Sequence, residues 1–469
     1  MKYFFWGVLA LVFINNKSFA QENIKVSLDS VSKSISKPFI NERLELSLKD
    51  AIIYALQNKA DATKAKLQIE NAEYKIEETK AQLLPQISGS GNITNNPLLQ
   101  KSAIPGEIIG QPGTTILATF GQKWNASIGA HLSQNIFNQS IFTGLKAAKT
   151  TREFYQINAE LTDEELMQKV AQNYYQVYTT KEQLKVIDSS LANTIKIKEI
   201  LKGLYNNGLA KKIDLDRLDV KLSNIQTQRQ KSLNAIEIQE NTLKFFIGMP
   251  IEQTIIFPKL NYETVTLSNF QEELFKVEEL SKYKLLNTQK QLLFLQKQSI
   301  KANYYPTLSL DANYSYQGIG DDFPIFARDN SNANWFEVAS VGLNLNIPVF
   351  SGFSTHAKVK QTEIDIQSID EDIKNLRLAL HLEFTNSKAQ LINSIVTINN
   401  QKKNVELAQS VLNNTENNYY NGLTSLTDLI EAQNALIESQ NNLNQAILEY
   451  KLAEINLLKA KGQLTSLIK

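Results

Sequence analysis

The chain has 469 residues, and its 49 lysines and arginines nearly balance its 48 aspartates and glutamates, for a formal net charge of +1. This balance gives no reason to expect a nucleic-acid partner or a polybasic contact with a membrane. Cysteine is absent, which fits an exported protein that uses no disulfides and removes thiolate chemistry from consideration.

The first twenty residues have the pattern of a secretory signal peptide. Lys2 precedes an apolar run from Tyr3 to Ile14, and Ser18-Phe19-Ala20 forms a small-x-small cleavage site. The alternative is a buried N-terminal helix. A signal peptide over 1–20 is therefore predicted, and no Cys follows it that could carry a lipid anchor. Beyond it, no apolar run reaches the 18 residues of a transmembrane helix.

Residues 21–44 are polar and aperiodic, so an extended arm is predicted. Apolar residues at helical spacing then run from Leu46 to Leu84. Pro85 follows, and proline restricts the preceding residue to extended backbone, which predicts a change from helix to strand. The same change is predicted at Pro306, after a helix from about Phe270 to Tyr304.

Four segments alternate apolar and small polar residues with a period of two. Such alternation suits either a half-buried antiparallel sheet or a membrane barrel. The polar face is made mostly of Ser, Asn, Gly and Thr, which are typical of a face towards water. Polar loops at about 95–122 and 318–334 are predicted to be the tips of the strand pairs. The predicted strands are about 86–97, 123–136, 307–317 and 336–349.

Long helical patterns follow Phe137 and Phe350 and run without proline to Gly208 and Gly422. A helix of about 60 residues would span roughly 90 Å, which predicts two rods. The return helices after these glycines end at Gly248 and near Gly462. Residues 249–268 are predicted to form a linker in an equatorial region.

The second half of the chain repeats the first. Residues 205–248 and 419–462 agree at 11 of 44 positions without a gap. The two structural repeats are therefore predicted at 45–248 and 269–469. The second return helix carries a coiled-coil heptad, in which a row of mostly large apolar residues lies three residues before a row that is mostly Ala. The rows are Leu429, Leu436, Leu443, Tyr450 and Leu457, and Ala432, Ser439, Ala446, Ala453 and Ala460.

Four strands cannot close a membrane barrel, and an open sheet edge in lipid leaves backbone groups unpaired. Eight strands, from two chains, would fill their own interior with side chains. Twelve strands, from three chains, leave room for a pore. The count favours three or more copies.

The motif Tyr-x-x-Gly-Leu-x-x-x-x-Asp-Leu at 205–215 and 419–429 resembles that of the TolC-like outer-membrane efflux proteins. The helix-to-strand turns at Pro85 and Pro306 and the strand-to-helix turns at Phe137 and Phe350 belong to the same pattern. The resemblance covers about residues 45–465.

This resemblance implies a mixed α and β membrane protein that works as a homotrimer, with a 12-stranded transmembrane β-barrel continued by a periplasmic α-helical coiled-coil barrel. It also implies a passive exit duct of a tripartite efflux or type I secretion system in the outer membrane, with a large periplasmic part and with gating at the periplasmic tip by the adaptor and the pump. Its partners would be outer-membrane lipid, a periplasmic adaptor (membrane fusion protein), and an inner-membrane pump of RND or ABC type. Two alternatives are a structural coiled-coil envelope protein and an adaptor, but neither explains duplicated strand pairs.

Three groups of candidate site residues follow. On structural grounds alone, each of the two turns is a helix-to-helix connection in which Gly supplies positive φ. The resemblance adds a contact between these turns and the adaptor. The residues implied in that contact are Tyr205, Gly208, Leu209, Asp214, Tyr419, Gly422, Leu423 and Asp428. It places the periplasmic pore constriction at Asn413 and Glu416, where Asn413 departs from the acidic pattern. The lipid-facing barrel residues are predicted to be Trp124, Ile128, Leu310, Tyr314, Val341 and Leu343.

An enzyme is not expected. His131, His356 and His381 have no partner at metal-ligand spacing, and no phosphate-binding loop or nucleophile elbow occurs. Asp163-Glu164-Glu165 is predicted to be a solvated helix face rather than a catalytic pair. No cofactor or metal is predicted.

Overall fold

The computed structural model describes residues 44–258, 275–324 and 333–468. They divide into a small unit, residues 44–47 and 249–258, and a large unit that holds the rest. In the small unit, β1 (Leu44–Glu45) pairs in parallel with β6 (Ile255–Ile256). The predicted signal peptide, nearly all of the predicted arm, the second half of the predicted linker and the expected helix start at Phe270 lie outside the described residues.

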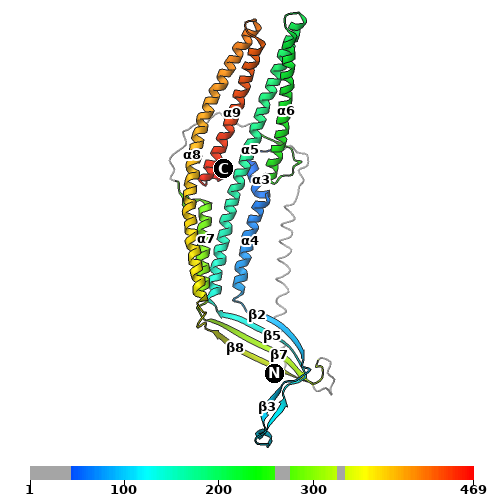
Figure 1. The fold of residues 1–469 in the computed structure, drawn as a ribbon, viewed down its shortest axis with the longest axis vertical. Helices are drawn as coiled ribbons and strands as arrows, with labels where there is room; N and C mark the ends of the chain where they lie inside the picture. The colour runs from blue at the N-terminus through cyan, green and yellow to red at the C-terminus, as the bar shows by residue number, and fades with distance from the viewer. Residues whose placement is uncertain (1–43, 259–274, 325–332, 469) are drawn as a thin grey trace. The chain divides into compact units, whose positions relative to one another are not determined.

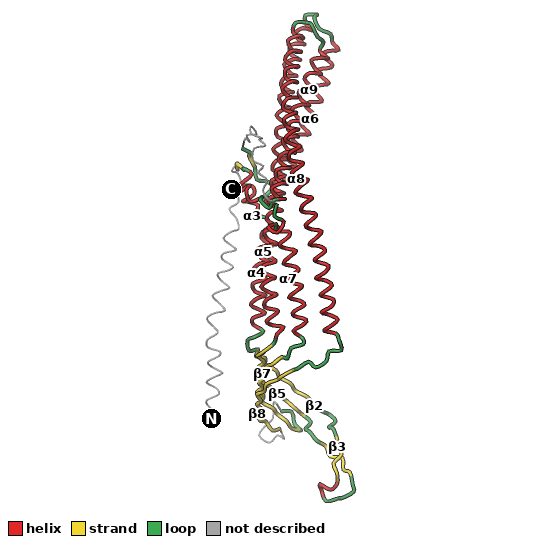
Figure 2. Tube along the Cα trace, turned by 90° about the vertical axis from the view of Figure 1, so that its left-hand side faces the viewer, coloured by secondary structure: helices red, strands yellow, loops and turns green. Residues whose placement is uncertain are grey.

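Two long helices dominate the large unit. α5 (Gln139–Asn206) has 68 residues and α8 (Ser354–Tyr420) has 67, and neither contains proline. The Asn138 side chain caps α5 by accepting a hydrogen bond from the Ser140 amide at 3.0 Å. At 1.5 Å per residue each helix is roughly 100 Å long, so both are the rods that the sequence predicts. Figure 2 shows the helices of the large unit running alongside one another.

The shorter helices flank these rods. They are α3 (Leu48–Asn58), α4 (Ala60–Ala81), α6 (Lys212–Ile247), α7 (Ser281–Ala302) and α9 (Leu426–Ala460). The 3-10 turn η3 (Val277–Glu279) precedes α7, and η4 (Leu464–Ile468) follows α9. None of the described helices is both long and apolar enough to cross a membrane.

The helical pattern predicted from Leu46 to about Leu84 forms two helices, α3 and α4, because the backbone is extended at Lys59 (φ −71°, ψ 132°). The Lys59 ammonium donates to the Phe245 carbonyl at 2.9 Å and lies 3.7 Å from the centre of the Phe245 ring. Gly248, which ends α6 with φ of 74°, lies so near Asn58 that a Cβ there would be 3.0 Å from the Asn58 carbonyl oxygen. The end of α6 therefore packs into the break between α3 and α4.

Packing of α9 explains its two heptad rows. α9 contacts both α8 and α5, so two sides of this helix are covered. In the first row Leu429, Leu436 and Leu457 are buried, and in the second row all but Ser439 are buried. Small residues in the second row allow close approach of a neighbouring helix.

The sheet of the large unit has four antiparallel strands in the order β2-β5-β7-β8 (Figure 1). They are β2 (Gln86–Asn95), β5 (Trp124–Phe137), β7 (Thr307–Gly320) and β8 (Ala333–Asn346). β8 ends three residues before the predicted end at 349, because Pro348 has no N–H for the ladder and restricts Ile347. Strands β2 and β8 are the two edges of the sheet.

The segment at about 95–122, predicted to be a polar loop at the tip of a strand pair, contains two strands of its own. β3 (Lys101–Pro105) and β4 (Thr115–Thr119) form an antiparallel hairpin in which Ile104 pairs with Ile116 and Ala103 with Leu117. The 3-10 turn η1 (Gly106–Ile109) joins them, and Gly110 closes it with φ of 80°. The β-branched run Thr114-Thr115-Ile116 was the sequence signal for this hairpin, which extends from the end of the sheet (Figure 1).

The four predicted switch residues lie at changes of secondary structure. Pro85 stands between α4 and β2, and Pro306 between α7 and β7. Phe137 is the last residue of β5, after an irregularity in its pairing with β7, and Phe350 lies between β8 and α8. Each repeat thus changes from helix to strand at proline and from strand to helix near phenylalanine.

Candidate functional site: the paired turns and the two-faced sheet

The turns at the ends of the long helices share one backbone design. Gly208 (φ 76°) donates to the Tyr205 carbonyl at 2.9 Å, and Leu209 donates to the Leu204 carbonyl at 2.9 Å. The second turn repeats this with Gly422 (φ 73°) bonded to Tyr419 at 3.0 Å, followed by a bond from Leu423 to Asn418 at 2.8 Å. This paired bonding is the Schellman arrangement, which needs left-handed backbone at glycine.

Each turn presents one leucine to solvent. Leu209 and Leu423 are both 76% exposed, and a Cβ added to either turn glycine would meet nothing within 4 Å. The glycines are therefore required by backbone conformation and not by crowding. The exposed leucines contribute little to the fold of the turn.

The two turns differ in the residues that start the following helix. Ser425 and Asp428 form a capping box on α9: the Asp428 amide donates to Ser425 Oγ at 3.2 Å, and the Ser425 amide donates to Asp428 Oδ2 at 3.0 Å. Hydrogen bonds from Thr424 and Ser425 lower the pKa of Asp428. α6 begins at Lys212, the preceding Lys211 supplies no side-chain cap, and the first-turn Asp214 faces Arg217 of the same helix at 3.7 Å.

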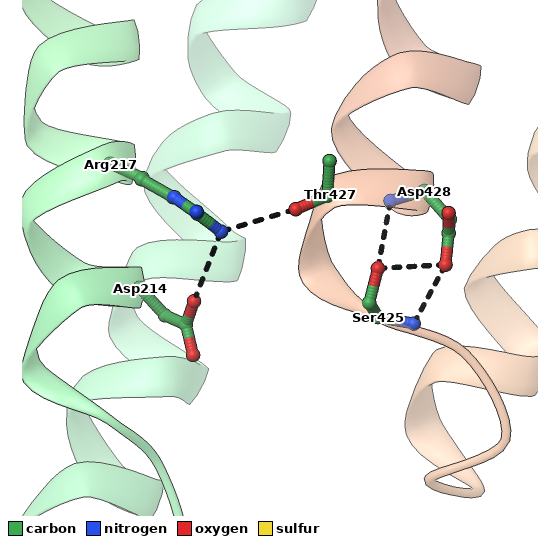
Figure 3. A network of polar contacts seen from close by, with 5 residues as sticks. All are labelled: Asp214, Arg217, Ser425, Thr427 and Asp428. Carbon is green, nitrogen blue, oxygen red and sulfur yellow. Dashed lines mark hydrogen bonds and ion pairs between the residues drawn. The ribbon is translucent and has the colours of Figure 1, made fainter.

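Polar contacts link the first return helix to the second (Figure 3). Arg217 of α6 donates to Thr427 Oγ1 of α9 at 3.2 Å while its guanidinium stays near Asp214. One turn further, the Lys221 ammonium donates to Gln433 Oε1 at 2.9 Å. Burial lowers the pKa of Lys221 to about 8. The two helical hairpins are thus joined by side chains near their tips.

An apolar cluster beneath these contacts draws on all four helices. Its buried members come from α5, α6, α8 and α9, and Leu218 and Leu429 are fully buried. Tyr419 packs against the cluster, and burial together with the nearby Asp214 charge raises its pKa. The full set is Ile197, Leu201, Leu218, Leu412, Leu426, Leu429, Ala432 and Leu436.

The predicted constriction residues lie on α8, in the last two turns before its tip. Asn413 is exposed and its side-chain oxygen accepts a hydrogen bond from Gln409 at 2.8 Å. Glu416 is partly exposed, and no ion pair joins it to another part of the described chain. Its carboxylate is therefore free to contribute to the electrostatic field at the tip.

The strand register places all six predicted lipid-facing residues on one face of the sheet. Leu310 pairs with Leu343, Ala312 with Val341, and Ile128 with Tyr316, and the face continues through Trp124 and Tyr314. Val341 and Leu343 are 78% and 67% exposed within the single chain. The other face holds the polar partners: Ser309 with Asn344, Asp311 with Gly342 and Asn313 with Ser340.

Aromatic side chains lie near both ends of the strands. Tyr316 stacks on Trp335 with ring centres 4.9 Å apart, towards the hairpin end of the sheet. At the helix end, Phe350 and Phe353 meet edge to face at 5.5 Å, with both side chains largely exposed. Aromatic girdles at the two borders of an apolar band are typical of outer-membrane barrels.

The acidic stretch in the middle of α5 is not the solvated face that the sequence predicts. Glu164 Oε1 accepts a hydrogen bond from Ser281 Oγ of α7 at 2.7 Å, so the carboxylate lies in the interface between α5 and α7. Burial raises the pKa of Glu164 and of Asp163. Only Glu165 of the three is exposed. Within the described ranges no group of three or more His, Asp or Glu side chains could hold a metal ion.

Because the folded-state pKa of Glu164 is raised, its protonated carboxyl group favours the fold below its unfolded pKa of about 4.3, and ionisation removes that contribution as pH rises through the folded pKa. Glu164→Gln keeps an acceptor for Ser281 and removes the half-buried charge. We expect a higher midpoint of thermal unfolding than wild type at pH 7.5 and convergence near pH 4. Glu165→Gln is the exposed control and should shift neither value. An equal or lower midpoint for Glu164→Gln at pH 7.5 would contradict this assignment.

Comparison with known proteins identifies the family. The sequence profile of the outer membrane efflux protein family matches residues 52–249 and 291–463. The chain is 20% identical over 341 residues to outer membrane protein TolC of Vibrio cholerae, covering 72% of this chain and 77% of that one. It is 22% identical over 425 residues to the pyoverdine export outer membrane protein OpmQ of Pseudomonas aeruginosa, covering 87% and 83%.

The fold agrees with that assignment. The crystal structure of the outer membrane protein VceC from Vibrio cholerae superposes with a TM-score of 0.68 at 16% identity, over 88% of this chain and 96% of that one. This confirms the predicted mixed α and β fold and does not favour a purely structural coiled-coil protein. The chain belongs to the outer membrane efflux protein family and is an outer-membrane exit duct of an efflux system, with a periplasmic portion.

Proposed function

We propose that three copies of the chain close one twelve-stranded barrel in the outer membrane and continue it as a passive helical tunnel through the periplasm. The open sheet is the observation that carries this proposal. β2 and β8 are edge strands of a sheet with one apolar face, and unpaired edges are not tolerated in lipid. Three copies supply twelve strands, whereas two would supply eight and leave no passage.

The duplication predicts how the edges meet. Inside the chain, β5 of the first repeat pairs with β7 of the second, with His131 opposite Asn313. Counted from the phenylalanine and proline switches, His131 corresponds to Asn344 and Asn313 corresponds to Asn92. Asn344 of one copy should therefore lie opposite Asn92 of the next. Both residues lie on the polar face, so this register keeps the two faces continuous across the seam.

The helices support the same assembly. α5 packs against α7 and α9 of the other repeat, but within the described chain α8 has no comparable packing against α4 or α6. By the duplication, α8 of one copy should pack against α4 and α6 of the next. These three helices carry exposed apolar side chains that such an interface would bury: Leu378, Leu382, Leu407 and Val411 on α8, Leu67 and Tyr74 on α4, and Val220, Ile238 and Phe245 on α6.

The paired turns are then the periplasmic mouth, where a periplasmic adaptor and an inner-membrane pump would engage the duct. Tyr205 and the two exposed leucines form the surface available to the adaptor, while Tyr419 is half-buried against the apolar cluster. The two residues that follow each turn differ, Lys211-Lys212 after the first and Ser425-Leu426 after the second, so the two turns present different chemistry. Three copies of Glu416 would add an acidic ring at the mouth that attracts cations.

The contacts between the hairpins near the tips act as a latch in this proposal. Arg217 and Thr427 hold α6 against α9, and separating the hairpins to widen the mouth breaks that bond. This hydrogen bond contributes about 1 kcal/mol of stability per copy, and a trimer contains three of them. The latch is weak enough for a partner to open.

Conductance across a planar lipid bilayer tests duct and latch together. Purified wild-type protein should run as a trimer in mild detergent and give small steady channels, and Arg217→Ala should raise the conductance several-fold. Arg229→Ala is a matched control, because Arg229 pairs with Asp188 at 2.6 Å inside one hairpin and not between hairpins. A monomer without channels would contradict the shared barrel. Equal conductance of Arg217→Ala and Arg229→Ala would contradict the latch.

A further inference from the structure

The polar face of the sheet is almost free of charge. Among the residues of β2, β5, β7 and β8 on this face, only His131 and Asp311 can ionise. β2 offers Gln, Ser, Asn and Thr there, and β8 offers Asn, Ser and Gly, with Phe336 and Val338 towards the hairpin end. The predicted seam between copies adds Asn92 and Asn344, which carry no charge. The electrostatic character of this face therefore depends on two side chains.

These two side chains lie on neighbouring strands and are held by defined contacts. His131 on β5 pairs across the ladder with Asn313 on β7, and its Nδ1 lies 2.7 Å from Asn313 Oδ1. His131 Nε2 lies 3.9 Å from Asp311 Oδ1. Ser309 Oγ donates to the other carboxylate oxygen, Asp311 Oδ2, at 2.8 Å. The side chains of His131 and Asp311 remain open to solvent, at 44% and 29% exposure.

The contacts determine where a proton would go. The side-chain oxygen of Asn313 can only accept a hydrogen bond, so this contact requires the tautomer in which Nδ1 of the neutral His131 ring donates and Nε2 is unprotonated. The unprotonated Nε2 faces the Asp311 carboxylate. Protonation of Nε2 creates an imidazolium beside that carboxylate and cancels its charge. Histidine is the side chain whose charge changes between about pH 5 and 8.

We propose that Asp311 gives the barrel lumen a preference for cationic over anionic solutes and that protonation of His131 removes this preference. The inference rests on the proposed trimer, in which the polar face lines the lumen and carries three aspartates and three histidines. No charged side chain of the described strands on this face competes with them. The duct thus discriminates by charge inside the membrane, independently of the periplasmic mouth, and the discrimination falls on acidification.

Cysteine accessibility tests this charge preference from the outer side of the barrel, so the result does not depend on whether the contacts between the hairpins open. The chain has no cysteine, so Ser340→Cys introduces a single thiol on β8 opposite Asn313 and one row from Asp311. The thiol is treated from outside with cationic and with anionic methanethiosulfonate reagents, and the ratio of their rates reports local potential. Thiolate content cancels in the ratio. At pH 7.5 we expect the cationic reagent to be favoured about fivefold over the anionic one, as expected for one charge at this spacing in water.

Three comparisons isolate the two residues. Asp311→Asn should bring the cationic-to-anionic rate ratio at Ser340→Cys down to the ratio measured at Ser127→Cys. Ser127 is a lumen site four residues along β5 from His131, so it lies more than one Debye length from the charged pair. Lowering the pH to 5 should do the same in the Ser340→Cys protein but leave the ratio unchanged when His131→Gln is added. The proposal is overturned if Asp311→Asn leaves the rate ratio unchanged. It is also overturned if lowering the pH reduces the ratio as much with His131→Gln as without it.

A failure of the trimer itself gives a different result. Val341→Cys lies on the apolar face, next to Ser340 in sequence, and should resist both charged reagents. If Val341→Cys reacts and both Ser340→Cys and Ser127→Cys do not, the polar face does not line a lumen and the proposed barrel is wrong. If the lumen sites react as expected but the ratios do not depend on Asp311, only the charge inference is wrong.

Discussion

Leu343→Arg should abolish assembled trimer in the outer membrane, whereas Asn344→Arg should leave most of it in place. The two residues are adjacent on β8 and project to opposite faces of the sheet. An arginine at a lipid-facing midplane site costs about 2–4 kcal/mol, and the cost applies three times in a trimer, while a lumen site remains in water. The abundance of heat-resistant trimer in outer-membrane fractions measures the difference.

The paired design controls for effects of arginine itself. Both substitutions add the same side chain to the same edge strand, one residue apart, so a general effect on synthesis or export would lower both. Equal loss of trimer from the two variants would show that the faces of β8 are wrongly assigned.

Leu209→Asp and Leu423→Asp should block export while leaving trimers in the outer membrane at wild-type abundance. Both leucines lie at turns, 76% exposed, and make little contribution to the fold. Exposed apolar side chains of this kind can anchor a partner, and losing a central anchor costs about 2 kcal/mol or more of binding energy. Export is measured in cells that carry the matching pump. Because the turns differ at Lys211-Lys212 and Ser425-Leu426, any residual export should differ between the two variants.

The control is a substitution of similar chemistry away from the turns. Leu98 is 91% exposed between β2 and β3, at the opposite end of the sheet from the helices, so Leu98→Asp should export normally. Normal export by both turn variants at normal abundance would mean that the adaptor does not engage the duct through these leucines.

Much of the fold follows from local patterns. The alternation around Leu310 and Leu343 sets the faces of the sheet, and the register observed between β7 and β8 brings these two residues opposite each other. Proline at 85 and 306 and glycine at 208 and 422 have backbone requirements that no tertiary contact overrides, so they mark the ends of elements wherever they occur.

What the sequence did not predict depends on contacts between distant segments. The sequence pattern predicts that Lys59 is helical, but its ammonium binds the carbonyl of Phe245, 186 residues away, and the helix is interrupted at Lys59. Glu164 sits among acidic residues that suggest a solvated face, yet Ser281 of α7 covers it. His131 has no partner nearby in sequence, and only the pairing of β5 with β7 brings it beside Asn313 and Asp311.

Cross-linking across the predicted seam tests the shared barrel most directly. Asn344→Cys and Asn92→Cys in one otherwise cysteine-free chain should be joined by mild oxidation or a short thiol-specific cross-linker, since residues directly opposite in a ladder have Cβ atoms about 4.5–5.5 Å apart. The product should be a covalent trimer on denaturing gels that reductant returns to monomer. Asn344→Cys with Ile93→Cys is the control, because Ile93 lies on the opposite face of the sheet. A covalent trimer from Asn344 with Asn92 and not with Ile93 is predicted; only monomer from both pairs, in protein extracted from the outer membrane, would contradict the shared barrel.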